Sequence, residues 1–203
     1  MTGKKRTQYH HGDLRAALLK NAAEMIAEGG VESVTMRALS RRIGVFRTAP
    51  YRHFANKAAL LAGVAEEGFQ RLQQCLAAVK VQEEDILTRF REMGIAYVQF
   101  AVENPSHYRL MFSRETSDFE AYPDLETAAK VVFDTLMTTI EQGQTANKIK
   151  SGDPRALAYA AWATVHGLSW LWLGGQISDL TDLEELTNVT TQTLVDGMTH
   201  KGT

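Results

Sequence analysis

The sequence predicts an all-α protein, and three observations support this prediction. Apolar residues recur at intervals of three and four along most of the chain, while the alternation typical of strands is nearly absent. Residues that favour helix ends stand at the borders of the apolar stretches. We expect about nine helices and no sheet, divided into a small N-terminal domain over 1–57 and a larger helical domain over 58–203.

The first two helices have well-marked borders. The first is expected over about 13–28, and Gly29 and Gly30 stop it because glycine readily adopts a left-handed backbone. The second begins after Thr35, whose hydroxyl group can cap it, and ends at Gly44. Their apolar faces comprise Leu14, Leu18, Ala22, Met25, Ala38, Leu39 and Ile43.

Two more helices complete the N-terminal part. A short third helix is expected over about 47–54, and Asn56 can cap a long fourth helix. The apolar face of the fourth helix comprises Leu60, Leu61, Val64 and Phe69. The polar stretch over 80–84 marks the link to the rest of the chain.

The remaining helices follow this link. Asn104 and Pro105 end the fifth helix, and a short aromatic segment follows over 107–112. Asp153 and Pro154 begin the eighth, because aspartate caps a helix and proline fits its first turn. The apolar stripe of the fifth helix comprises Phe90, Met93, Tyr97 and Phe100. That of the seventh helix comprises Leu125, Ala129, Val132, Leu136 and Ile140. That of the last helix comprises Leu183, Leu186, Thr190, Leu194 and Met198.

Charge is divided unevenly along the chain. Residues 1–60 hold 11 Lys and Arg against 4 Asp and Glu, a net charge of +7, whereas residues 61–203 hold 11 against 20, a net charge of −9. A basic end on an acidic body is typical of a protein that contacts nucleic acid at that end, although a basic surface without a partner would have the same composition.

Composition also bears on the compartment. Cys75 is the only cysteine, which excludes an internal disulfide and fits a reducing cytosol. Residues 1–20 are polar and basic with no apolar run behind them. The most apolar stretch, over 156–173, contains polar residues and is slightly short for a membrane span, which needs roughly 20 apolar residues. We therefore expect a cytoplasmic protein without a membrane segment.

The segment over 35–54 is the most informative part of the chain. Two short helices are separated by a tight turn at Gly44. A small core between them can be closed by Ala38, Leu39, Ile43, Val45, Tyr51 and Phe54. The arginines left to point outward are Arg37, Arg41, Arg42, Arg47 and Arg52. This division predicts a helix-turn-helix, in which the second helix presents its outer face to the major groove of DNA.

The residues of this segment resemble a known family. Thr-Met-Arg-Ala-Leu-Ser-Arg-Arg-Ile-Gly-Val at 35–45, Tyr-Arg-His-Phe-Ala-Asn-Lys at 51–57 and Leu-Leu at 60–61 are similar, in order and spacing, to the DNA-binding domain of TetR family regulators. The resemblance covers roughly 14–61. It implies a ligand-responsive transcription repressor that binds palindromic double-stranded operator DNA as a homodimer and is released by a small, largely apolar or aromatic effector.

The resemblance also implies roles for individual residues. The residues expected at base edges are Arg47 and Thr48. The residues expected at phosphates are Thr35, Arg37, Tyr51, His53 and Lys57. The ring of Tyr51 could also pack in the core, with its hydroxyl group outside. A basic arm of Lys4, Lys5 and Arg6 would follow the DNA backbone or enter a minor groove.

Two residues depart from the family pattern. Phe46 occupies a turn position where the family often has a small hydroxyl residue, and its ring could pack inward or stack against a sugar or a thymine methyl group. Pro50 lies inside the recognition segment and removes one backbone donor. We therefore expect the third helix to begin late or to be tightly wound.

The body is similar to one subgroup of the family. The resemblance is carried by Trp162 with His166 and Gly167, and by the segment over 105–112. Its methionine and aromatic residues suit an apolar ligand cavity, although an ordinary helical core would use the same residue types. The candidate ligand-binding residues are Met93, Tyr97, Phe100, Met111, Phe112, Phe133, Met137, Trp162, His166 and Trp170. Tyr97 and His166 would be the polar contacts of the ligand.

The family resemblance implies a homodimer formed by the last two helices, over about 154–174 and 182–199. Small residues would allow close approach of these helices, and larger apolar residues would supply contact area. The small residues are Ala156, Ala160, Ala161, Ala163 and Gly167, and the larger ones are Leu186, Leu194 and Met198.

No motif in the sequence supports catalysis, and we expect neither a cofactor nor a metal. His10 and His11 with Asp13 make a poor preformed metal site. Two alternatives to a ligand-responsive repressor stay open. One is a DNA-binding regulator that is controlled by a protein partner or has no effector. The other is a helical enzyme or carrier whose N-terminal domain only resembles a DNA-binding domain.

Overall fold

The structure, a computed structural model, describes residues 11–79, 85–177 and 182–199. Within these ranges the chain forms eight α-helices and three short 3-10 turns, and no strand beyond one isolated bridge between Ile149 and Thr199. The predicted all-α class is confirmed. The predicted link over 80–84 and the basic arm lie outside the described residues.

The N-terminal part, called the head below, is built from short elements. Its helices are α1 (His11–Gly29) and α2 (Met36–Ile43), and its 3-10 turns are η1 (Val31–Ser33) and η2 (Pro50–Arg52). The body contains α3 (Lys57–Ala77), α4 (Ile86–Glu103), α5 (Pro105–Met111), η3 (Arg114–Thr116), α6 (Pro123–Thr145), α7 (Pro154–Leu173) and α8 (Leu183–Met198).

Side chains cap the helices where the sequence predicts it. Thr35 Oγ1 accepts a hydrogen bond from the backbone N–H of Ala38 at the start of α2, and Asn56 Oδ1 accepts one from Ala59 at the start of α3. Asp153 caps α7 in the same way. These contacts satisfy donors that have no partner inside the helix, so the helix borders follow from local chemistry.

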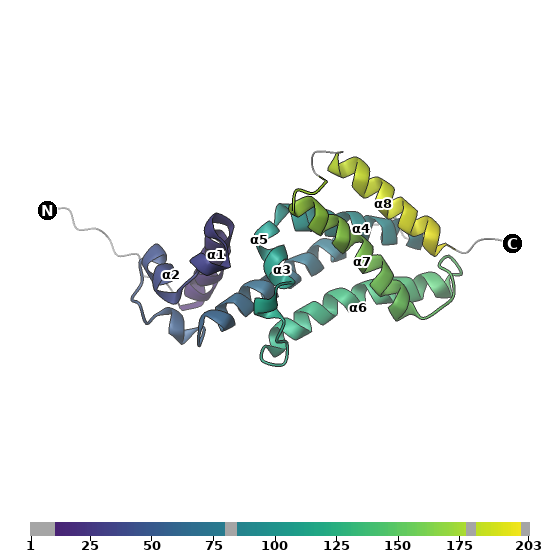
Figure 1. Cartoon of the computed structure of the whole chain (residues 1–203). Helices are drawn as coiled ribbons and strands as arrows, with labels where there is room; N and C mark the ends of the chain where they lie inside the picture. The colour runs from purple at the N-terminus through teal and green to yellow at the C-terminus, as the bar shows by residue number, and fades with distance from the viewer. Residues whose placement is uncertain (1–10, 80–84, 178–181, 200–203) are drawn as a thin grey trace.

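The long helix α3 connects the head to the body (Figure 1). It contacts α1 in the head and α4, α5 and α6 in the body. The short helix α5 lies at the junction, where it also contacts α1. The predicted boundary between 1–57 and 58–203 falls in the first turn of α3. A displacement of α3 would therefore change its contacts in both the head and the body.

The third predicted helix, over 47–54, is shorter than expected. The structure has only the 3-10 turn η2 there, as the position of Pro50 suggests. An α-helix that begins at Arg47 would need its first hydrogen bond from the N–H of residue 50 to the carbonyl of Phe46, and proline has no N–H. Instead Ala49 donates to Phe46 over 2.8 Å, which is the spacing of a tight turn.

Candidate DNA-binding head and body cavity

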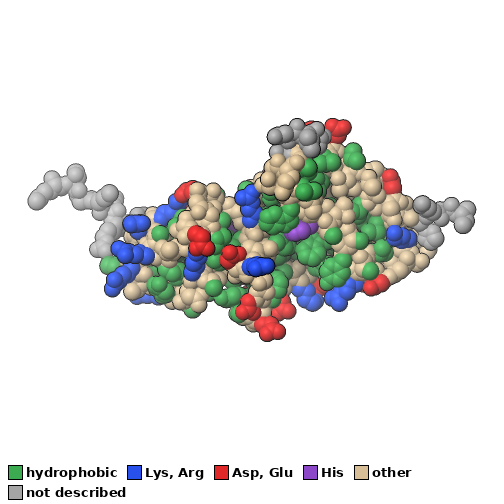
Figure 2. Space-filling view, viewed as in Figure 1, with side chains coloured by type: hydrophobic (Ala, Val, Ile, Leu, Met, Phe, Trp, Pro, Cys, Tyr) green, Lys and Arg blue, Asp and Glu red, His purple; other side chains and the backbone are tan. Residues whose placement is uncertain are grey.

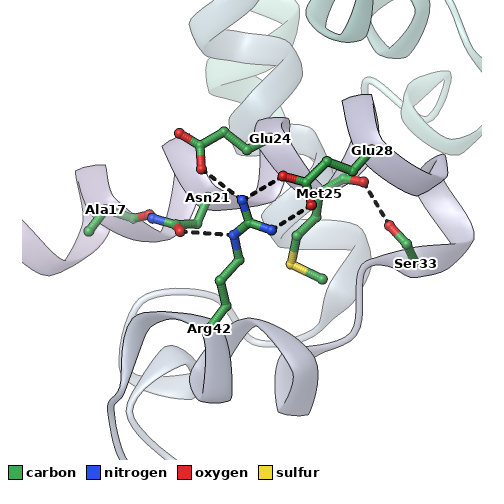
Figure 3. A network of polar contacts seen from close by, with 7 residues as sticks. All are labelled: Ala17, Asn21, Glu24, Met25, Glu28, Ser33 and Arg42. Carbon is green, nitrogen blue, oxygen red and sulfur yellow. Dashed lines mark hydrogen bonds and ion pairs between the residues drawn. The ribbon is translucent and has the colours of Figure 1, made fainter.

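An arginine network joins the two helices of the head (Figure 3). Arg42 on α2 donates from Nη1 and Nη2 to the two carboxylate oxygens of Glu28 over 2.6 and 2.8 Å. It also donates to Glu24 over 3.1 Å and, from Nε, to Asn21 over 3.2 Å. The hydrogen bonds from Arg42 lower the pKa of the Glu28 carboxyl group below its ordinary value.

This network corrects one sequence-based expectation. Arg42 was predicted to point outward with the other arginines of the segment, but its guanidinium binds three side chains of α1. A guanidinium whose N–H groups already face carboxylates is poorly placed to bind phosphate. Arg42 therefore serves to orient α2 on α1, and the arginines available to a partner are fewer than the sequence indicates.

The turn between α2 and η2 begins at Gly44. Its φ of 76° lies in the left-handed region, and its N–H donates back to the carbonyl of Ser40 over 3.0 Å. A residue with a side chain would be strained there. The chain then leaves α2 sharply, as the helix-turn-helix prediction requires. It continues through the exposed residues 46–48 to η2.

Most residues predicted to bind DNA lie on the surface of the head. Thr35, Arg37, Arg47, Thr48 and Tyr51 are exposed. His53 and Lys57 are half-buried, and Lys57 Nζ lies 3.6 Å from the exposed Glu32 carboxylate. Figure 2 shows basic side chains gathered at the end of the molecule that carries α2.

Three aromatic residues of this segment have different positions. Phe54 is buried against α1 and α3, as predicted. Tyr51 is 55% exposed, so it does not belong to the core. Phe46 is 76% exposed, which decides against the inward packing considered from the sequence. Both exposed rings are next to arginines in the chain, Phe46 beside Arg47 and Tyr51 beside Arg52.

The body encloses a cavity of about 520 Å³. Its wall is formed by α3, α4, α6 and α7, with contributions from α5, from α8 and from the chain between α5 and α6. Apolar and aromatic side chains make up most of it. Seven of the ten predicted ligand-binding residues line it: Met93, Tyr97, Met111, Phe112, Phe133, Trp162 and His166.

The other three predicted residues lie elsewhere. Phe100 is 1% exposed and packs in the core, and Met137 packs against the smaller core cluster around Phe90. Trp170 does not line the cavity, but its Nε1 donates to His166 Nε2 over 2.8 Å. Helical spacing places these residues near the helix faces that line the cavity, but it does not decide which side chains reach the cavity.

A hydrogen-bonded aromatic network supports one wall of the cavity: Tyr97, Trp162 and His166 line the wall, and Tyr108 and Trp170 bond to His166 without lining it. Tyr108 and Tyr97 place their hydroxyl oxygens 2.7 and 3.0 Å from His166 Nδ1. Trp162 donates from Nε1 to the Tyr97 oxygen over 3.0 Å. Since the indole of Trp170 can only donate, His166 Nε2 must accept. In the neutral imidazole, Nδ1 therefore carries the proton and donates toward the tyrosines.

Burial keeps this network uncharged. It raises the pKa of Tyr97 well above 10 and that of Tyr108 to about 12. It also lowers the pKa of His166 below its ordinary value. The wall is consequently polar but neutral around pH 7.

The structure adds cavity residues that the sequence did not suggest. Phe69, Leu72 and Leu76 bring α3 itself into the wall, and Thr191 brings in α8. Arg91 is also part of the wall. It follows Phe90, which belongs to the predicted apolar stripe of α4. A charged residue beside an apolar stripe is ordinarily exposed, so sequence reasoning had no signal for it.

Other kinds of site find no support in the part of the chain that the structure describes. It contains no group of three or more His, Cys, Asp or Glu side chains that could hold a metal ion. None of its helices is long and apolar enough to cross a membrane. The side chains of His10, His11 and Asp13 lie outside the described set.

A helix-turn-helix head, a connecting helix and a hollow helical body define a DNA-binding regulator. Comparison with known proteins gives the family. A model described as bacterial regulatory proteins, tetR family, matches residues 18–64, and one described as tetracyclin repressor-like, C-terminal domain, matches residues 90–194. The second match alone covers more than half of the chain. The chain belongs to the TetR family of bacterial regulatory proteins.

Individual relatives agree with this assignment. A protein of unknown function from Rhodococcus sp. RHA1 is 32% identical, with a TM-score of 0.85 over 96% of this chain and all of the other. The nucleoid occlusion factor SlmA of Marinomonas sp. (strain MWYL1) is 27% identical over 153 residues, which are 74% of this chain and 76% of SlmA. The regulator FadR from Bacillus subtilis, solved with stearoyl-CoA, has the same fold, with a TM-score of 0.76 and 18% identity over 90% of this chain and 98% of FadR.

Proposed function

We propose that this protein is a transcription repressor that binds a palindromic operator as a homodimer and is released by a small, largely apolar or aromatic effector. The observation that carries the proposal is the cavity of about 520 Å³, whose wall includes the helix that leads to the head. A ligand in this cavity would contact Phe69, Leu72 and Leu76 on α3 directly. Ligand occupancy and head position would thus be linked through one element.

The head would contact DNA with the residues predicted from the sequence. Arg47 and Thr48 would contact base edges, since they stand exposed just before η2. Thr35, Arg37, Tyr51, His53 and Lys57 would contact phosphates. Thr35 uses its hydroxyl oxygen to cap α2, which leaves the hydroxyl hydrogen for a phosphate oxygen.

The homodimer would form through α7 and α8. Ala156, Ala160 and Ala163 are exposed on α7, and Val189 is exposed on α8. A groove on this surface is lined by Ala160, Thr164, Val189, Thr190, Thr193, Leu194, Gly197 and Met198. Ala161 and Met198 are buried in the body, so they contribute less to a dimer surface than the sequence suggested. Two-fold symmetry would place the two heads about one DNA turn apart, roughly 34–36 Å.

Release from DNA would follow a shift of α3. The cavity residue Met111 lies on α5, which contacts both α1 and α3 at the junction. An effector that prefers a different position of these helices would splay the two heads so that they no longer fit successive grooves. A coupling of about 1–3 kcal/mol would change DNA affinity by roughly 5–150-fold. The protein would act in the cytoplasm and would not be an enzyme.

The first experiment is selection of bound sequences from a random DNA pool with the purified protein, repeated at two salt concentrations. We expect enrichment of a palindrome, and that operator then serves to screen small apolar and aromatic compounds for release. A failure to enrich any sequence, with only weak salt-sensitive retention, would contradict an operator-binding dimer.

A second candidate is a DNA-binding protein that is controlled by a protein partner or has no effector. The observation in its favour is the 27% identity to SlmA, whose name describes a nucleoid function and no effector. The variant Val132→Trp would place an indole in the cavity wall and separates the two candidates. If the first proposal holds, this variant should no longer be released from DNA by an effector. If the second holds, its DNA binding and its regulation should be the same as those of the wild type.

A further inference from the structure

The polar groups of the aromatic wall are largely engaged with one another. The ring nitrogens of His166 face Trp170 on one side and the tyrosine hydroxyl groups on the other. The indole N–H of Trp162 donates to Tyr97, and no charge is carried by this wall. A ligand that approaches this wall meets ring faces and edges more than available hydrogen-bonding groups, although Tyr97 and His166 both line the cavity.

Arg91 is the exception among the residues that line the cavity. Among the described residues that line the wall, it is the only Lys, Arg, Asp or Glu. Its side chain is 28% exposed, so Arg91 lies at the border between the cavity and solvent. The cavity is therefore apolar along most of its length and positively charged at one place.

The contacts of Arg91 leave its hydrogen-bonding capacity incomplete. Nη2 donates to Asn188 on α8 over 2.8 Å, and Nη1 lies 3.3 Å from the Glu92 carboxylate. Nε is buried and has no acceptor. Glu92 neutralises the guanidinium only in part, because the pair is open to water and makes a single long hydrogen bond. A buried N–H without an acceptor is unfavourable, and a ligand oxygen could relieve it after a small rotation of the guanidinium.

We propose that the cavity selects an apolar molecule that carries one carboxylate, with the apolar part against the aromatic wall and the carboxylate at Arg91. This inference rests on the proposed function of the cavity as an effector site. A planar guanidinium matches a carboxylate with two parallel hydrogen bonds, which a neutral ligand cannot form. The position of Arg91 at the border lets the carboxylate keep part of its hydration while the rest of the ligand is buried.

Calorimetric titration of the full chain with a matched pair of probes tests this. The probes are biphenylacetate and its uncharged amide, which differ in charge but hardly in shape. At about pH 7.5 the carboxylate is ionised, and a charge-assisted hydrogen bond predicts at least about tenfold tighter binding of the carboxylate than of the amide. Arg91→Gln should bring the two affinities within about twofold of each other, and Arg91→Lys should keep part of the preference.

Arg89→Gln is the matched control. It removes the same charge from the same helix, but Arg89 does not line the cavity, so the preference for the carboxylate should persist. Circular dichroism of each variant checks that the fold is retained. Equal binding of both probes to the wild type, or a preference that survives Arg91→Gln, would overturn the inference while the cavity keeps its proposed role. If neither probe bound, the inference of a carboxylate ligand would also be overturned. The screen for compounds that release the operator would then test the proposed function separately.

Discussion

Trp170 Nε1 lies 2.8 Å from His166 Nε2, and this contact opposes protonation of the imidazole. If His166 gained a proton, two N–H groups would face each other across this distance, and the hydrogen bond would be lost. Burial acts in the same direction, since it lowers the pKa of His166. The wall of the cavity is thus arranged around a neutral histidine.

We expect the protein to lose stability as the pH falls below about 6.5, the ordinary pKa of histidine. The pKa values of His166 and His107 are lowered in the folded state, mainly by burial, so the unfolded chain takes up these protons first. The free energy of unfolding is therefore highest above the ordinary pKa of histidine, and it declines as the pH falls toward the lowered pKa values of the two folded-state histidines. Chemical unfolding at about pH 7.5 and about pH 5.5 measures the decline. His166→Gln should show a smaller decline than the wild type, and an equal one would contradict this account.

Arg42→Gln should lower the melting temperature, because it removes the hydrogen bonds to Glu24 and Glu28 that hold α2 on α1. Arg41→Gln is the control, since Arg41 is exposed on the same helix. Thermal unfolding followed by circular dichroism compares the two variants. If both lowered the melting temperature equally, the loss would reflect general charge on α2 and not the network.

Arg47→Ala and Lys57→Ala should affect DNA binding in different ways. Loss of a base contact at Arg47 should cost about 1–3 kcal/mol on the operator and relax sequence preference. Loss of a phosphate contact at Lys57 should weaken binding to all DNA and flatten the salt dependence by about one unit. Fluorescence anisotropy with operator and scrambled DNA over a salt series measures both effects. Unchanged binding in both variants would refute the assignment of these residues.

Gly167→Leu should produce a folded monomer. A Cβ atom at Gly167 would meet nothing within 4 Å, so a larger side chain fits the isolated chain. In a dimer through α7 and α8, the same side chain would keep the helices apart. Analytical ultracentrifugation should show a dimeric wild type, a monomeric variant, and a dimeric Thr138→Leu control, which alters an exposed position on α6. A Gly167→Leu protein that remains dimeric would place the dimer surface elsewhere.

Local features of the fold could be predicted because they depend on neighbouring residues. The caps at Thr35, Asn56 and Asp153 are contacts between a side chain and backbone two or three residues away. The effect of Pro50 on the third helix follows from its missing N–H, so the sequence indicated that the helix would be distorted. Its full replacement by a 3-10 turn was not predicted.

The sequence by itself determined the helical class, the capped borders of α2, α3 and α7, the helix-turn-helix and the family, since periodicity, caps and motif spacing are properties of short segments. Three features were decided only by the tertiary structure. Arg42 binds α1, Phe100 and Met137 pack outside the cavity wall, and Arg91 lines that wall. The physical reason is that helical spacing assigns a side chain to a face, whereas the crossing of helices far apart in sequence decides whether that face meets core, cavity or solvent.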